Sequence, residues 1–102
     1  MAVDQMIQRV QDALKLSDLK SKLPRNPKVV DVRVEDYVDA DGEDALRVWI
    51  ILDQSVEVEK IGGDDITSVK STIRDRIREL GLELWPYMHM AKQSEFDEEV
   101  EG

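Results

Sequence analysis

The stretch KVVDVRVEDYVDADGEDALRVWIILD, residues 28–53, decides the fold. Over residues 28–38, valines alternate strictly with charged residues, and this alternation is typical of a half-buried strand. Residues 45–53 predict a second strand. The apolar side chains that share one face of the two strands are Val30, Val32, Val34, Leu46, Val48, Ile50 and Leu52. The short acidic connection contains Asp41-Gly42, a turn signal, so we expect an antiparallel hairpin.

A helix is expected on each side of this hairpin. Residues 3–16 place apolar side chains at the helical period, and Pro24 and Pro27 end any continuation of that helix. Residues 65–80 carry a narrow apolar stripe, and Gly81 is placed to end this second helix in a left-handed conformation. Asp64 or Asp65 can cap its beginning.

A third strand is predicted over residues 82–91, where apolar and aromatic side chains alternate. Pro86 cannot donate to a ladder, so this strand should lie at an edge. The fold class is therefore α+β, a two-layer sandwich in the order α-β-β-α-β, with helices packed on a three-stranded, mainly antiparallel sheet. We expect one domain over residues 1–93 and a mobile acidic tail over 94–102.

Composition excludes several classes of protein. The 102 residues are 41% hydrophobic and 36% charged, which is typical of a soluble globular domain. There is no cysteine, so disulfides, thiolate nucleophiles and cysteine-ligated zinc are excluded. No apolar run has the length of a membrane span, so we expect a cytoplasmic protein without a membrane partner. The net charge of −9 argues against binding nucleic acid.

No motif of the chain predicts catalysis, a metal or a cofactor. The acidic turn at Asp39, Asp41, Glu43 and Asp44 lacks the spacing of a calcium loop, which needs its glycine at the sixth position. His89, the single histidine, has no nucleophilic partner at a recognisable spacing. We therefore expect a protein that is not an enzyme.

The second face of the predicted sheet is unusually aromatic. Six candidate interface residues fall on odd positions, opposite to the apolar even ones: Tyr37, Trp49, Ile51, Trp85, Tyr87 and His89. Two helices packed on the even face would leave this face against water, and an apolar patch of that kind marks an interface. The alternative is that the first helix, or the tail through Phe96, crosses over and covers it.

These features favour a non-catalytic interaction module that forms a homodimer, binds a small protein partner, or does both. Two alternatives stay open. A KH-like nucleic-acid-binding domain would have the right element types, although the Gly-x-x-Gly clamp is missing. A small-molecule- or metal-responsive domain would use the acidic turn or an aromatic pocket.

One segment suggests a family. The sequence WPYMHMAKQSEF, residues 85–96, with the acidic turn before Glu43-Asp44-Ala45-Leu46-Arg47-Val48, resembles small bacterial α-β-β-α-β proteins. Such proteins are encoded beside a helical partner of the HEPN type, so the resemblance implies a two-gene module similar to toxin–antitoxin pairs. The resemblance implies no catalytic residue.

Overall fold

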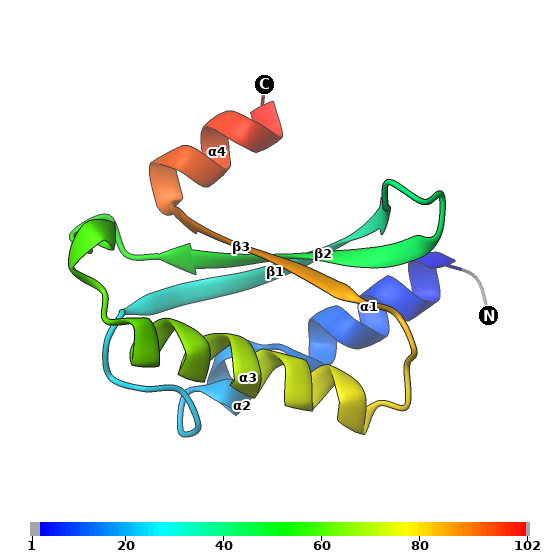
Figure 1. Cartoon of the computed structure of the whole chain (residues 1–102), viewed down its shortest axis with the longest axis horizontal. Coiled ribbons are helices and arrows are strands. Elements are labelled where there is room, and N and C mark those ends of the chain that lie inside the picture. The colour runs from blue at the N-terminus through cyan, green and yellow to red at the C-terminus, as the bar shows by residue number, and fades with distance from the viewer. Residues whose placement is uncertain (1–2, 102) are drawn as a thin grey trace.

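The computed structural model describes the backbone of residues 3–101 and the side chains of residues 5–97. Its helices and strands follow one another in the expected order, with short additional helices (Figure 1). The elements are α1 (Val3–Ala13), α2 (Leu16–Leu19), β1 (Val29–Val38), β2 (Asp44–Leu52), η1 (Val58–Lys60), α3 (Gly63–Glu79), β3 (Pro86–Lys92) and α4 (Gln93–Glu101). The α+β class and the order α-β-β-α-β are thus confirmed.

The sheet has the strand order β1-β2-β3, so β2 is central and the other two strands are edges. β1 and β2 form the predicted antiparallel hairpin, in which Val34 pairs with Val48. β3 runs parallel to β2, with Met88 beside Val48. The sheet is therefore mixed, with one antiparallel and one parallel pair of strands, whereas the sequence predicted mainly antiparallel pairing. The physical reason is α3, which carries the chain back along the sheet so that β3 starts at the same end as β2.

The core lies between the even-numbered face of the sheet and the helices. Figure 1 shows α1, α2 and α3 on one side of the sheet and α4 alone on the other. The side chains of Val10, Leu14, Leu19, Val32, Leu46, Val48, Ile50, Leu52, Val69 and Ile73 are almost completely removed from solvent in this layer. The even side chains of β2 from Leu46 to Leu52 are all members, so this strand fixes the position of the helices.

Two glycines end elements as the sequence predicts. Gly42 in the hairpin has φ of 81° and Gly81 after α3 has φ of 75°, both in the region that disfavours other residues. In the hairpin, one carboxylate oxygen of Asp39 accepts hydrogen bonds from the backbone N–H groups of Asp41 and Glu43, each at 2.9 Å. The acid at position 39 therefore shapes the turn.

Three predicted boundaries are corrected. The first helix stops at Ala13, whose carbonyl oxygen accepts a hydrogen bond from Arg76 Nε at 3.2 Å, and α2 follows as a separate turn. The third strand starts only at Pro86, and the leucines before it pack against the core from the connection. A helix, α4, follows β3 without a linker, where the sequence predicted that the domain ends at residue 93 and a tail begins.

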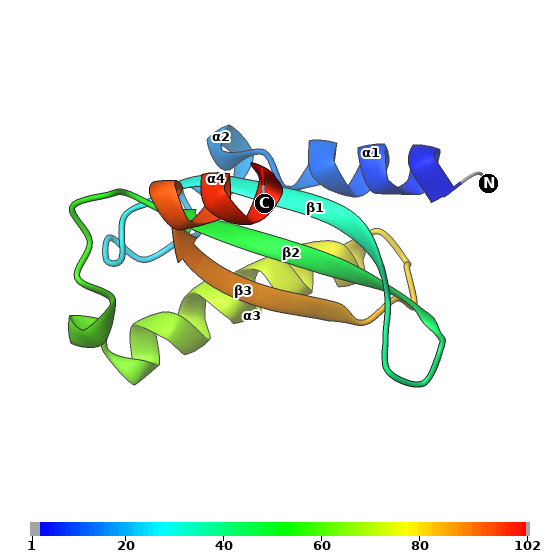
Figure 2. The same ribbon diagram turned by 90° about the horizontal axis from the view of Figure 1, so that it is seen from above.

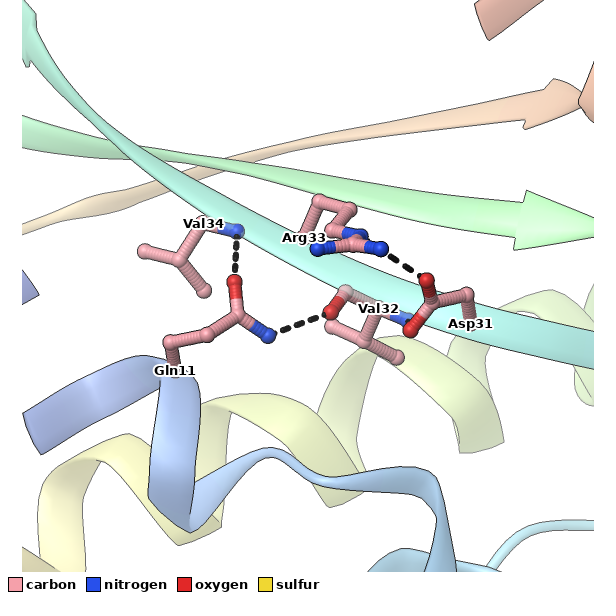
Figure 3. Close-up of polar contacts among 5 residues, drawn as sticks. All are labelled: Gln11, Asp31, Val32, Arg33 and Val34. Atoms are coloured by element: carbon pink, nitrogen blue, oxygen red, sulfur yellow. Dashed lines mark hydrogen bonds and ion pairs between the residues drawn. The ribbon is translucent and has the colours of Figure 1, made fainter. Parts of the chain in front are cut away.

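Gln11 fastens α1 to the outer edge of β1 (Figure 3). Its Nε2 donates to the carbonyl oxygen of Val32 at 2.7 Å, and its Oε1 accepts from the N–H of Val34 at 2.8 Å. Beside it, Asp31 accepts hydrogen bonds from the N–H of Val32 and from Arg33 Nε, each at 2.8 Å. The amide thus satisfies two backbone groups that β2 cannot reach.

We expect Gln11→Ala to lower the free energy of unfolding by about 1–3 kcal/mol, because it leaves two partly buried backbone groups unpaired. Gln8→Ala is the matched control, since Gln8 lies on the exposed side of the same helix and bonds only Asp12 among the described residues. Urea denaturation measures both variants. Equal stability of the two would contradict the anchoring role of Gln11.

We expect Val48→Asp to unfold the domain. The side chain is 0% exposed, and an unpaired buried carboxylate costs several kcal/mol against a total stability of about 5–15 kcal/mol. Val38→Asp is the control, because Val38 belongs to the same sheet but is 61% exposed. Circular dichroism melting should show an unfolded Val48→Asp chain and a folded Val38→Asp chain. A Val48→Asp chain that melts close to wild type would mean that the faces are assigned wrongly.

Candidate protein-interaction surface

The odd-numbered face of the sheet is only partly covered. We call its uncovered part the open sheet face, and its members are Arg33, Glu35, Tyr37, Arg47, Trp49, Tyr87 and His89. The strand register explains why they gather: Arg33, Trp49 and His89 lie side by side across the three strands, and so do Glu35, Arg47 and Tyr87. Because side chains alternate along a strand, both rows point away from the core.

The aromatic rings of this face contact one another in two groups. The ring centroids of Tyr37 and Tyr87 lie 5.3 Å apart, although these residues belong to the two edge strands. They meet because Ala45, the neighbour of Tyr37 on β2, is too small to separate them. The second group is centred on Trp49, whose ring lies 5.2 Å from His89 and 5.6 Å from Phe96 of α4.

Arg47 and Glu35 join the two groups. The guanidinium carbon of Arg47 lies 4.3 Å above the ring centroid of Tyr37 and 6.0 Å from that of Trp49. One carboxylate oxygen of Glu35 accepts a hydrogen bond from Trp49 Nε1 at 3.0 Å and one from Arg47 at 3.4 Å. The polar groups of the face therefore hold its aromatic rings in position.

Tyr87 is connected to the hairpin turn. Its hydroxyl donates to Asp39 Oδ2 over 3.5 Å. Burial of the ring, followed by the negative charge of Asp39, raises the pKa of Tyr87 above its ordinary value of 10.0. The turn and the third strand are thereby coupled, although 48 positions separate the two residues in the sequence.

The structure brings four of the six predicted interface residues together on the open sheet face: Tyr37, Trp49, Tyr87 and His89. Ile51 lies on the same side but is only 4% exposed, because α4 packs over this end of the sheet. A shallow hollow beside α4 remains, lined by Asp31, Arg33, Ile51 and Phe96.

Trp85 is not part of this face, and its predicted position is wrong. It precedes β3, so the alternation of the strand does not include it. Its ring lies against Arg74 of α3, with 5.7 Å between the guanidinium carbon and the ring centroid. Since α3 packs on the even side of the sheet, the 59% exposed Trp85 belongs to the helical side of the molecule.

Of the two segments that could cover the aromatic face, the first helix and the tail, only the tail lies over it. The first helix does not cover it, because α1 packs on the opposite side (Figure 1). The tail covers part of it through α4 and Phe96, over β2 and β3. The bond between Glu35 and Trp49 is not predicted by the sequence pattern, although the register of a hairpin can place Glu35 opposite Arg47.

The part of the chain that the structure describes shows neither a metal-binding cluster nor a membrane-spanning helix. No group of three histidine, aspartate or glutamate side chains gathers there in a way that could hold a metal ion. No helix among residues 3–101 is both long and apolar enough to cross a bilayer. His89 is exposed and stacks on Trp49, with no hydrogen bond to another described side chain.

No known protein family, curated protein or solved structure matches the chain. The resemblance of residues 85–96 to proteins encoded beside a HEPN-type partner therefore stays a prediction. The geometry of the open sheet face is the main basis for a functional argument.

The contact between Tyr87 and Asp39 predicts a pH effect. The folded chain holds the phenolic proton of Tyr87 more tightly than the unfolded chain, so stability should fall as pH rises above 10. In a Tyr37→Phe background, absorbance titration reports Tyr87 alone, and its midpoint should lie above 10.0. Asp39→Asn keeps an acceptor for the turn but removes the charge, so the midpoint should move back toward 10.0. An unchanged midpoint would contradict the contact.

Proposed function

We propose that this chain is a non-catalytic interaction module that self-associates through the open sheet face. The observation that carries the proposal is a preassembled group of tryptophan, tyrosine and arginine side chains on a sheet face that the chain's own helices cover only in part. These three residue types dominate the energetics of protein interfaces. The lack of cysteine is compatible with the reducing cytoplasm, where we place the module.

The contacts within the face favour binding. Arg47 is stacked on Tyr37, and Trp49 is held between Glu35, His89 and Phe96. Side chains that are already fixed lose less conformational entropy when a partner covers them. Each aromatic residue can bury ~150–250 Å², so the group can supply the centre of an interface that covers ~800 Å² per partner.

The charges of the face favour a second copy as the occupant. Arg33 and Arg47 are positive, and Asp31 and Glu35 are negative, so both signs lie within one surface. A two-fold axis places the same surface on both sides, and a surface of mixed sign can then pair with itself. Arg33 is exposed and can pair with an acid of the mate, and the second carboxylate oxygen of Glu35 can accept from a base of the mate while the first keeps its bonds to Trp49 and Arg47.

Trp49→Glu should convert the assembly into monomers. The substitution places a charge at the centre of the interface and next to Glu35, which cannot accept a second carboxylate there. Light scattering measures the mass, and far-UV circular dichroism checks that the fold survives. His89→Glu is the second variant, since His89 is exposed in the single chain and its substitution should not affect folding.

Trp85→Glu is the matched control. It makes the same change at the other tryptophan, which lies beside Arg74 and away from the open sheet face, so the mass should stay that of wild type. A wild-type chain that remains monomeric at high concentration would contradict self-association. If that monomer is bound by a co-expressed neighbour and loses it on His89→Glu, the face serves a different protein.

A further inference from the structure

The outer edge of β1 consists of two unlike halves. In the first half, Gln11 bonds the backbone of Val32 and Val34, which shows that these groups point away from β2 (Figure 3). Because backbone direction alternates along a strand, the N–H and C=O groups of Asp36 and Val38 point to the same outer side. No described residue makes a hydrogen bond to those groups.

The side chain of Gln11 indicates what this edge can bind. It donates to one carbonyl oxygen and accepts from the N–H two residues further on, as the N–H and C=O groups of one residue in a parallel neighbouring strand would. The edge therefore already has the geometry for a further strand. Gln11 prevents such a strand from pairing with Val32 and the N–H of Val34.

The second half of the edge is accessible. Figure 2 shows that α1 and β1 diverge toward the hairpin, so α1 does not follow β1 over its last residues. Val38 is 61% exposed and Asp36 is exposed as well. An exposed, unpaired strand edge is a template for strand addition.

The negative charge near this half of the edge favours a positively charged partner. Residues 29–65 hold twelve acidic and three basic side chains. Of the acids at this end of the hairpin, Asp36, Asp41 and Asp44 form no ion pair within the described part of the chain. A second copy would bring its own acids against them, so the homodimer of the open sheet face does not use this edge.

We infer that the free half of the β1 edge, from the carbonyl of Val34 to Val38, binds an extended basic segment of a partner protein by strand addition. The backbone of the segment pairs with Asp36 and Val38, and its lysine or arginine side chains lie beside Asp36, Asp41 and Asp44. Gln11 marks the end of the site. This binding is independent of self-association, because it uses backbone groups at an edge and not the side chains of the open sheet face.

The test uses a blocked hexapeptide of alternating lysine and valine, added to the full chain. NMR hydrogen exchange follows the backbone amides of Asp36 and Val38, which should exchange about fivefold more slowly at saturation, as a new hydrogen bond of ordinary net strength requires. The same peptide with an N-methyl group on every backbone nitrogen is the control for backbone pairing, because neither of its edges can then pair with a strand, and it should give no protection.

Charge is tested with Asp36→Asn and Asp41→Asn, which should together weaken peptide binding by about tenfold at low salt. Asp75→Asn is the matched control, because Asp75 is an exposed acid on α3, and its substitution should leave the affinity unchanged. Peptide binding without protection of Asp36 and Val38, or with equal protection by the N-methylated peptide, would overturn the inference. So would the absence of binding. None of these results bears on the mass of the chain in solution, which tests self-association separately.

Discussion

The burial of the even-numbered side chains of β2 is the constraint on which the rest of the structure depends. Leu46, Val48, Ile50 and Leu52 have no exposed surface, and β2 is the only strand of the sheet with a neighbour on each side. The apolar stripes of α1 and α3 are both used to cover this face. Residues 3–101 contain no further long helix for the other face, where α4 has nine residues and reaches only part of it. The open sheet face stays partly uncovered because the apolar stripes of the long helices lie on the even-numbered face.

The open sheet face and the β1 edge share one strand but differ in chemistry. The face offers aromatic rings and charges of both signs, held in place by Glu35 and Arg47. The edge offers unpaired backbone groups among acids, and Gln11 limits its length. A module with these two surfaces could bind a copy of itself and an extended partner at the same time, since the residues that carry each are different.

Local patterns in the sequence predict much of this fold. The alternation of valines, the Asp-Gly turn and the glycine after α3 each act within a few residues, so the hairpin and α3 could be predicted. The direction of β3 depends on where α3 returns the chain, and the alternation does not encode it. Trp85 was misplaced for a related reason, because the period of two was extended beyond the first paired residue, Pro86.

The contacts that sequence patterns did not predict join distant segments. Gln11 reads as an ordinary polar residue of a helix, and only the docking of α1 beside β1 reveals its bonds to Val32 and Val34. The acidic tail reads as solvated, yet Phe96 provides one apolar contact on Trp49, and α4 lies on the sheet. In the candidate site, the alternation of the two hairpin strands predicts which of their side chains share a face. The contacts between the aromatic rings could not be predicted, because they depend on the register of all three strands.

The most direct test of self-association compares the two tryptophans in one sample. Trp49 lies on the open sheet face and Trp85 lies on the helical side, so their indole N–H resonances report the two surfaces separately. We expect that dilution of the wild-type chain shifts the Trp49 resonance progressively and leaves that of Trp85 unchanged. Resonances that are both independent of concentration, or a shift of Trp85 alone, would contradict association through the open sheet face.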